Sequence, residues 1–176
     1  MRRFAFLVVV LAILSAPLAA QSGTHEAGAY VPVTVFDPAR DAAADIGAAL
    51  AEARRTGKRV LVDVGGDWCI WCKRLDRFFE EQKDVAAYLH ANYVTVKVNY
   101  SKENRNEAVL SRYPKVAGYP HLFVLDTTGV LLRSQDTGAL ESGKAHDREK
   151  VLAFLKAWAP GGSAEESDPR GKPERR

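Results

Sequence analysis

Residues 60–73 read VLVDVGGDWCIWCK, and this stretch decides the fold. Residues 60–64 form a near-continuous apolar run rich in valine, which is typical of a strand buried on both faces. A pair of glycines interrupts the run, and a helical pattern of apolar residues begins at Cys69. We therefore predict a strand that turns into a helix, with the two cysteines of the chain, Cys69 and Cys72, at the junction.

This junction suits thiol–disulfide exchange, in which the thiolate is the attacking species. Free backbone N–H groups and the helix dipole stabilise an anion at a helix N-terminus. We expect Cys69 to lie there, to attack a target sulfur and to form a mixed disulfide. Cys72 lies one turn deeper, where its own helix covers it, and is expected to resolve that intermediate.

Two other roles for the cysteines are weaker. A structural disulfide over two intervening residues closes a very small loop and removes little entropy from the unfolded chain. A zinc site needs about four ligands, of which the pair supplies two. The histidines that could complete such a site are scattered: His25, His90, His121 and His146. No metal or cofactor is predicted.

Outward from this stretch, the pattern predicts one α/β domain with a central mixed sheet and helices on both faces. Asp37 and Pro38 are expected to begin the first helix, which Gly57 ends. The other predicted strands are 31–35 (an edge strand), 93–99, 121–125 and 130–132, and the other predicted helices are 69–80, 84–90, 101–112 and 147–158. Residues 138–143 are expected to form a loop.

The N-terminus resembles a secretory signal, with Arg2 and Arg3 before an apolar run and small residues up to Ala20. The alternative is an uncleaved membrane anchor, for which the run is slightly short. We predict a signal peptide at 1–20, cleaved near Ala20, then a leader and edge strand at 21–36, the domain at 37–159 and a disordered tail at 160–176. In a bacterium, such export leads to the periplasm, where disulfides persist.

The formal net charge is +3, and loss of Arg2 and Arg3 would leave 23 basic residues against 22 acidic ones. This balance provides no electrostatic footprint for nucleic acid. Nucleic-acid binding is therefore not predicted.

Residues 60–73 resemble the active-site strand and helix of the thioredoxin superfamily, especially the secreted branch that includes the C-terminal domain of the bacterial transmembrane thiol-reductant conductor. The resemblance extends over residues 46–158. Asp63 matches the buried carboxylate of that family, Lys97 matches the lysine of the next strand, and Tyr119-Pro120 matches the cis-proline loop that faces the cysteines.

The resemblance implies roles for these residues. In an apolar strand, burial would raise the pKa of Asp63, so that its carboxylate could accept the proton of Cys72. Lys97 would offset the buried charge, unless it extends to solvent. A cis bond at Tyr119-Pro120 would expose backbone groups to an extended substrate. Trp68 and Trp71 either form an apolar, substrate-binding collar around the sulfurs or belong to the core.

The function that follows is an exported, monomeric thiol:disulfide oxidoreductase that reduces or isomerises disulfides in exported proteins. A membrane thiol-reductant conductor is the expected electron donor. The sequence departs from the family at Ile70-Trp71 between the cysteines, a dipeptide that influences redox poise, and at Tyr119, which is bulkier than usual. A periplasmic oxidant and a redox-inert peptide-binding module therefore remain as alternatives.

Overall fold

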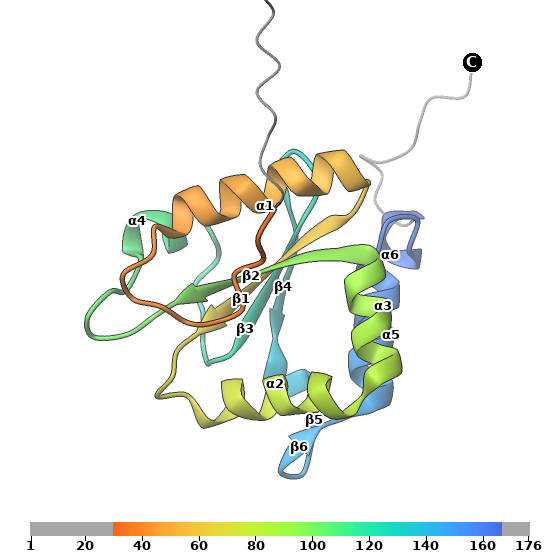
Figure 1. Ribbon diagram of the computed structural model, residues 1–176. Helices are drawn as coiled ribbons and strands as arrows, with labels where there is room; N and C mark the ends of the chain where they lie inside the picture. Colours follow the sequence, from red (N-terminus) through yellow and green to blue (C-terminus); the bar gives the residue numbers. More distant parts are fainter. Residues whose placement is uncertain (1–29, 167–176) are drawn as a thin grey trace, which may run out of the picture.

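The computed structural model describes residues 30–166 (Figure 1). The expected signal segment lies outside these residues, as does the tail beyond residue 166. The helices are α1 (Ala42–Thr56), α2 (Ile70–Glu81), α3 (Lys83–Asn92), α4 (Glu107–Leu110), α5 (Arg148–Trp158) and α6 (Ser163–Glu166), with a 3-10 turn η1 (Thr137–Leu140). The strands are β1 (Arg59–Gly65), β2 (Tyr93–Asn99), β3 (His121–Leu125), β4 (Leu131–Asp136), β5 (Glu141–Ser142) and β6 (Ala145–His146).

The central sheet has four strands in the order β2-β1-β3-β4. Strand β1 pairs in parallel with β2 and antiparallel with β3, which continues antiparallel into β4. The predicted mixed sheet is therefore confirmed. Strand β1 lies inside the sheet, so the chain that leaves its C-terminal end enters α2 from a fixed position.

Helices cover both faces of this sheet, as predicted (Figure 1). One core lies under α1 and contains alternate residues of β1, namely Val60, Val62 and Val64. The other core contains Leu61 of β1 and lies under α2, α3 and α5. Because side chains alternate along a strand, Asp63 and Gly65 share the face of Leu61 and point toward α2.

The first helix begins later than the sequence pattern predicts. Asp41, not Asp37, is its N-cap, and Asp41 Oδ1 accepts hydrogen bonds from the backbone N–H groups of Ala43 and Ala44 at 2.9 and 3.1 Å. Asp37 instead accepts from Ala39 N in a preceding turn. The helix that starts at residue 42 buries Ala42 and Ile46 in the core.

Replacing Asp41 with alanine should therefore lower the free energy of unfolding by about 1 kcal/mol, the usual cost of losing an N-cap. Asp37→Ala removes only the bond within the turn and should cost less than half as much. Urea denaturation of both variants measures the difference. Equal losses would contradict the assignment of Asp41 as the cap.

The predicted helix at 101–112 is wrong over most of its length, because only α4 is helical there. The asparagines of this stretch bind backbone groups instead. Asn99 Nδ2 donates to Asn104 O at 2.9 Å, and Asn106 Nδ2 donates to Asn99 O at 2.7 Å. Asn106 also adopts a left-handed φ of 49°. Such local bonds compete with a helix.

Three other segments differ from the sequence-based prediction. Residues 31–35 contribute only an isolated parallel bridge between Val33 and Val96 at the edge of β2. The expected loop at 138–143 contains most of η1 and the β5 strand of a small hairpin with β6. Helix α6 lies within the expected disordered tail.

Candidate active site

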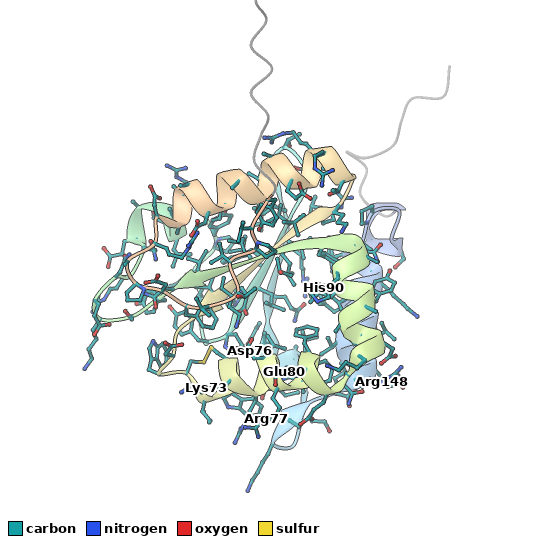
Figure 2. The ribbon with its side chains drawn as sticks, viewed as in Figure 1. Lys73, Asp76, Arg77, Glu80, His90 and Arg148 are labelled. Atoms are coloured by element: carbon teal, nitrogen blue, oxygen red, sulfur yellow. A yellow bond between two sulfur atoms is a disulfide. The ribbon has the colours of Figure 1, made fainter. Side chains whose placement is uncertain are left out.

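Cys69 and Cys72 form a disulfide with an S–S distance of 2.23 Å and a Cα–Cα distance of 5.2 Å. Figure 2 shows this bond at the end of α2 close to Lys73. Cys69 is the N-cap of α2, and its sulfur accepts a hydrogen bond from Cys72 N at 3.0 Å. A thiolate at Cys69 would thus receive a backbone N–H and the positive end of the helix dipole.

The two sulfurs differ little in exposure. Cys69 is 4% exposed and Cys72 is 1% exposed, so in the oxidised form the cysteine expected to attack is nearly as buried as the one expected to resolve. The reason is an apolar cluster in which Phe36 joins the cysteines, with Trp71 and Tyr119 packed against it. The neighbours Trp68 and Ile70 are each 59% exposed, so apolar surface adjoins the buried sulfurs.

Gly65 and Phe36 form the wall behind Cys72. A Cβ atom at Gly65 would lie 2.5 Å from Cys72 Sγ and 2.9 Å from Phe36 Cζ, so only glycine allows this close approach. Phe36 reaches the site because Lys97 N binds Val33 O at 3.1 Å and fixes the N-terminal segment along β2. The sequence patterns did not identify Phe36, since its role depends on this pairing.

Asp63 lies on β1 between Lys97 of β2 and Leu122 of β3. Its Oδ1 atom is shielded from solvent and makes no hydrogen bond within the described residues. Burial raises the pKa of Asp63 to about 7, the Lys97 charge opposes this rise, and Asp76 adds to it. The carboxyl group therefore exists in both protonation states near neutral pH.

Lys97 forms its ion pair with Asp76 of α2, not with Asp63. Its Nζ also lies 4.4 Å from the centre of the Phe36 ring. Sequence reasoning missed Asp76, although it follows Cys72 by one helical turn and therefore lies on the same side of α2. The ammonium is thus bonded to Asp76 and acts on the charge of Asp63 only through space.

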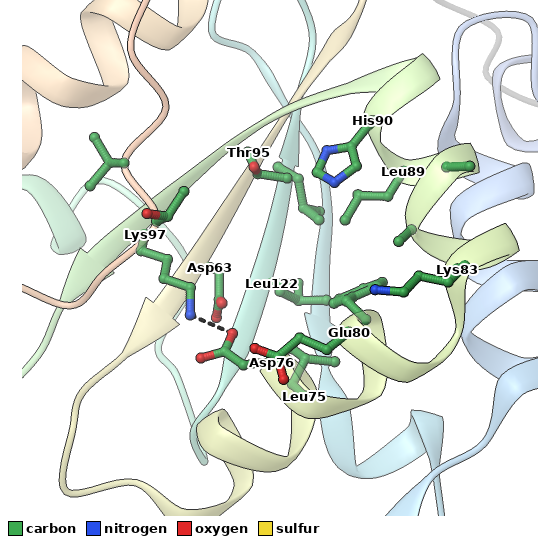
Figure 3. A pocket seen from close by; sticks show the side chains of 16 residues that line it. Asp63, Leu75, Asp76, Glu80, Lys83, Leu89, His90, Thr95, Lys97 and Leu122 are labelled. Carbon is green, nitrogen blue, oxygen red and sulfur yellow. Dashed lines mark hydrogen bonds and ion pairs between the residues drawn. The ribbon is translucent and has the colours of Figure 1, made fainter.

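These three charged groups meet at a cavity of about 660 Å³ between the sheet and helices α2 and α3. Figure 3 shows Asp63, Lys97 and Asp76 together at one end, while Leu89 and His90 lie at the other. Because the cavity adjoins solvent as well as the carboxyl of Asp63, it gives water a path to that group.

The Tyr119–Pro120 peptide bond is cis, as the resemblance implies. The Tyr119 ring stacks on Tyr100 with centroids 4.7 Å apart and meets the Trp68 ring edge-on at 5.6 Å. Trp68 Nε1 donates to Tyr100 O at 2.7 Å, which fixes the exposed indole beside Cys69. Sequence reasoning missed Tyr100, the residue that links the other two rings.

Trp71 points elsewhere. Its ring lies edge-on to His146 of β6 at 5.7 Å, and the Arg74 guanidinium lies 4.3 Å from its centre. The structure gives no ring contact between Trp68 and Trp71 within residues 30–166. The two indoles therefore have separate partners: Trp68 contacts Tyr119, and Trp71 packs against the cysteine cluster.

Among the described residues, no group of three or more His, Cys, Asp or Glu side chains is arranged to hold a metal ion. None of the helices in this range is long and apolar enough to cross a membrane. The chemistry available at the site is that of the disulfide, its helix N-terminus and the nearby Asp63 carboxyl.

Comparison with known proteins supports this description. A family model described as thioredoxin-like matches residues 41–127. The thiol:disulfide interchange protein DsbD of Pseudomonas sp. (strain JR1 / K1) is 30% identical over 149 residues, which are 82% of this chain and 24% of the relative. The DsbD of Citrobacter koseri is 28% identical over 100 residues, or 57% of this chain and 16% of that relative.

Two solved structures share the fold. A disulphide isomerase from Xylella fastidiosa Temecula1 has a TM-score of 0.60 and 24% identity, covering 71% of this chain and 95% of its own. The DsbD C-terminal domain of Neisseria meningitidis in its oxidised form has a TM-score of 0.52 and 22% identity, covering 70% of this chain and 98% of its own.

The chain spans less than a quarter of the length of the two DsbD relatives. The matching family model includes β1, both cysteines and the cis-proline loop. The chain belongs to the thioredoxin superfamily and is similar to the C-terminal domain of DsbD.

Proposed function

We propose that this protein is an exported thiol:disulfide oxidoreductase that reduces or isomerises disulfides in exported proteins. The observation that carries the proposal is the Cys69–Cys72 disulfide at the N-terminus of α2, with Asp63 buried behind it. Trp68, Tyr119 and Pro120 are proposed to bind the substrate beside Cys69.

In the reduced protein, the Cys69 thiolate attacks one sulfur of a substrate disulfide. The bond between the two substrate sulfurs breaks, a mixed disulfide with Cys69 forms, and the other substrate sulfur leaves as a thiolate. Cys72 then loses its proton and attacks Cys69 Sγ. The second substrate thiolate leaves, and the Cys69–Cys72 disulfide remains.

Asp63 is proposed to accept the Cys72 proton. Cys72 Sγ lies against Gly65, and Asp63 leaves the same face of β1 two residues earlier, about 7 Å along the strand. One water molecule can bridge such a gap. A carboxyl pKa of about 7 lets the group accept the proton and return it through the cavity in each cycle.

A donor must return two electrons to the disulfide after each reduction. We propose a membrane thiol-reductant conductor as this donor, and the similarity to DsbD, a thiol:disulfide interchange protein, supports it. The N-terminal pattern supports export to the periplasm, and we expect a monomer. If the pair were strongly oxidising against glutathione, the protein would act as an oxidant, which is the second candidate because Ile70-Trp71 departs from the family.

Cys72→Ser tests the proposed reaction because it removes the resolving thiol and leaves Cys69 free to attack. The variant should accumulate mixed disulfides with exported proteins, visible as reductant-sensitive bands on non-reducing gels and identifiable by mass spectrometry. Cys69→Ser is the matched control and should trap far less, since the remaining thiol lies within α2 and lacks the N-cap position that stabilises a thiolate. If Cys72→Ser trapped nothing, the redox-inert peptide-binding alternative would be favoured.

A further inference from the structure

His146 is a buried imidazole that the proposed reaction does not use. It is 7% exposed, and neither ring nitrogen makes a hydrogen bond within the described part of the chain. Its position is fixed on both sides: it pairs with Glu141 in the β5–β6 hairpin, and the next residue, Asp147, caps α5. Burying an imidazole without a hydrogen-bond partner costs free energy, so its surroundings need explanation.

The His146 ring contacts Trp71, which lies beside the redox pair. The ring lies edge-on to Trp71, with centroids 5.7 Å apart and planes at 89°, and it also contacts Phe78 at 6.0 Å. Trp71 stands between the cysteines in sequence and packs against their cluster. The indole therefore contacts His146 and also packs against the cysteine cluster.

The charges around the imidazole favour its neutral form. Burial lowers the pKa of His146, and the Arg74 guanidinium of α2 lowers it further. Glu141 is the carboxylate opposite it in β5, and burial raises the pKa of Glu141. Arg77 of α2 is a further cation near the hairpin (Figure 2), and Asp147 is the adjacent carboxylate in the chain.

Acidification should therefore weaken the contact between His146 and Trp71. As the pH falls, His146 gains a positive charge close to Arg74 while Glu141 loses its negative charge. An imidazolium here would be buried beside the Arg74 guanidinium with no hydrogen-bond partner in the described residues, so protonated His146 should move away from Trp71. The pKa of His146 is lower in the folded protein than in the unfolded chain, so the neutral imidazole stabilises the fold at pH values above the ordinary histidine pKa. That stabilisation is lost as the pH falls through the pKa of the folded protein.

We propose that His146 is a positioning residue for the redox pair: its neutral imidazole holds the Trp71 indole against the cysteines, and protonation releases it. This inference rests on the proposed thiol–disulfide exchange. An indole packed on the sulfurs excludes water, which disfavours a thiolate. Release admits water, stabilises the thiolate of the reduced form, and makes the disulfide easier to reduce.

The experiment has a spectroscopic arm that needs no activity. In a Trp68→Phe/Trp158→Phe background, Trp71 is the only indole. With His146 present, its emission should change between about pH 8 and pH 5. His146→Phe keeps an aromatic edge and should give the same emission at pH 8 without the acid transition. His146→Ala should show at pH 8 the emission that His146 gives only in acid.

The redox measurement uses the protein with all three tryptophans in place, equilibrated with glutathione at about pH 8. His146→Ala should shift the equilibrium constant by at least about threefold toward the reduced protein. The equilibrium constant of His146→Phe should stay close to that of the protein without substitutions. Leu140→Ala is the matched control, because Leu140 is buried in the core next to the hairpin and has no ring to contact Trp71.

Three outcomes would overturn the inference. The Trp71 emission could be the same in the His146→Ala variant as in the protein with His146, or the acid transition could persist in His146→Phe. The third is a redox shift in Leu140→Ala equal to that in His146→Ala. If His146→Ala does not fold, the pH profile of His146→Phe still decides. Absence of exchange with glutathione in the unchanged chain would instead refute the proposed function, and the emission of Trp71 would still test the positioning role.

Discussion

Asp63→Asn is expected to stabilise the protein at and above neutral pH by about 2–4 kcal/mol. Burial raises the pKa of this carboxyl from 3.8 to about 7, so folding must bury a charge that the unfolded chain keeps in water. One pKa unit corresponds to about 1.4 kcal/mol, which sets the upper end of the range. Asparagine has a similar shape and carries no charge, so the penalty disappears.

The pH dependence of this gain has a definite sign. Below about pH 4 the carboxyl is protonated in both folded and unfolded chains, and the two proteins should be nearly equal in stability. Between about pH 4 and pH 7 the folded protein binds more protons than the unfolded chain, so its relative stability falls as the pH rises. Above about pH 7 the difference from the variant should be constant.

Urea denaturation of the oxidised proteins at about pH 4 and pH 8 measures this difference, because most other groups titrate alike in both chains. Asp76→Asn is the informative control. It frees Lys97 from its ion pair, so that the ammonium can turn to Asp63 and lower the pKa of that carboxyl. A gain from Asp63→Asn that is the same at both pH values would contradict a buried, titrating carboxyl.

The same substitution should slow turnover although it stabilises the fold. Asparagine cannot accept the Cys72 proton, and loss of a positioned general base typically costs 10²–10⁴-fold, so we expect roughly 10²-fold in the resolving step. Formation of the mixed disulfide by Cys69 should change little. Rapid-quench kinetics with a model disulfide separates the two steps. An equal slowing of both would argue against a role in proton transfer from Cys72.

The layout of the sheet was predictable because its signals are local. The apolar run at 60–64 and the alternation at 93–99 identify β1 and β2, and the order of strands and helices then limits the fold. The burial of Asp63 was predictable for the same reason, since its neighbours in β1 are apolar. The helix that follows the glycine pair placed Cys69 at an N-terminus.

What could not be predicted depends on contacts between distant segments. The sequence pattern placed the start of the first helix at Asp37, whereas in the folded chain Asp41 is the N-cap and Ala42 and Ile46 pack in the core. Lys97 pairs with Asp76 because both side chains line the same cavity between the sheet and α2, which no local pattern records. His146 was rejected as a zinc ligand from its spacing alone, and its contact with Trp71 exists only because the β5–β6 hairpin packs on α2.

Gly65→Ala is the second substitution with a large expected effect, a loss of about 1–3 kcal/mol in the oxidised protein. The added Cβ would lie 2.5 Å from Cys72 Sγ, well inside contact distance, and 2.9 Å from Phe36 Cζ. Neither atom can easily move, because the sulfur is bound to Cys69 and the ring is buried. The conflict is one of space, since Gly65 does not have a positive φ.

Gly47→Ala is the matched control, because a Cβ at Gly47 in α1 meets nothing within 4 Å. It should stabilise both redox forms equally, by about 0.5–1 kcal/mol, through the better helix propensity of alanine. Gly65→Ala should behave differently in the two forms. Reduction frees Cys72 to rotate about χ1 and relieve part of the clash, so the dithiol form should lose less stability than the disulfide form.

A thermodynamic cycle joins these two stabilities to the redox equilibrium. If the clash costs the oxidised form about 1.4 kcal/mol more than the reduced form, the potential of the pair rises by about 30 mV. Urea denaturation in both redox states and equilibration with glutathione measure the two sides of the cycle independently. Equal losses in both forms would show that Cys72 Sγ stays against Gly65 after reduction. The resolving thiol would then be held in one place throughout the reaction, with Phe36 and Gly65 as its fixed wall.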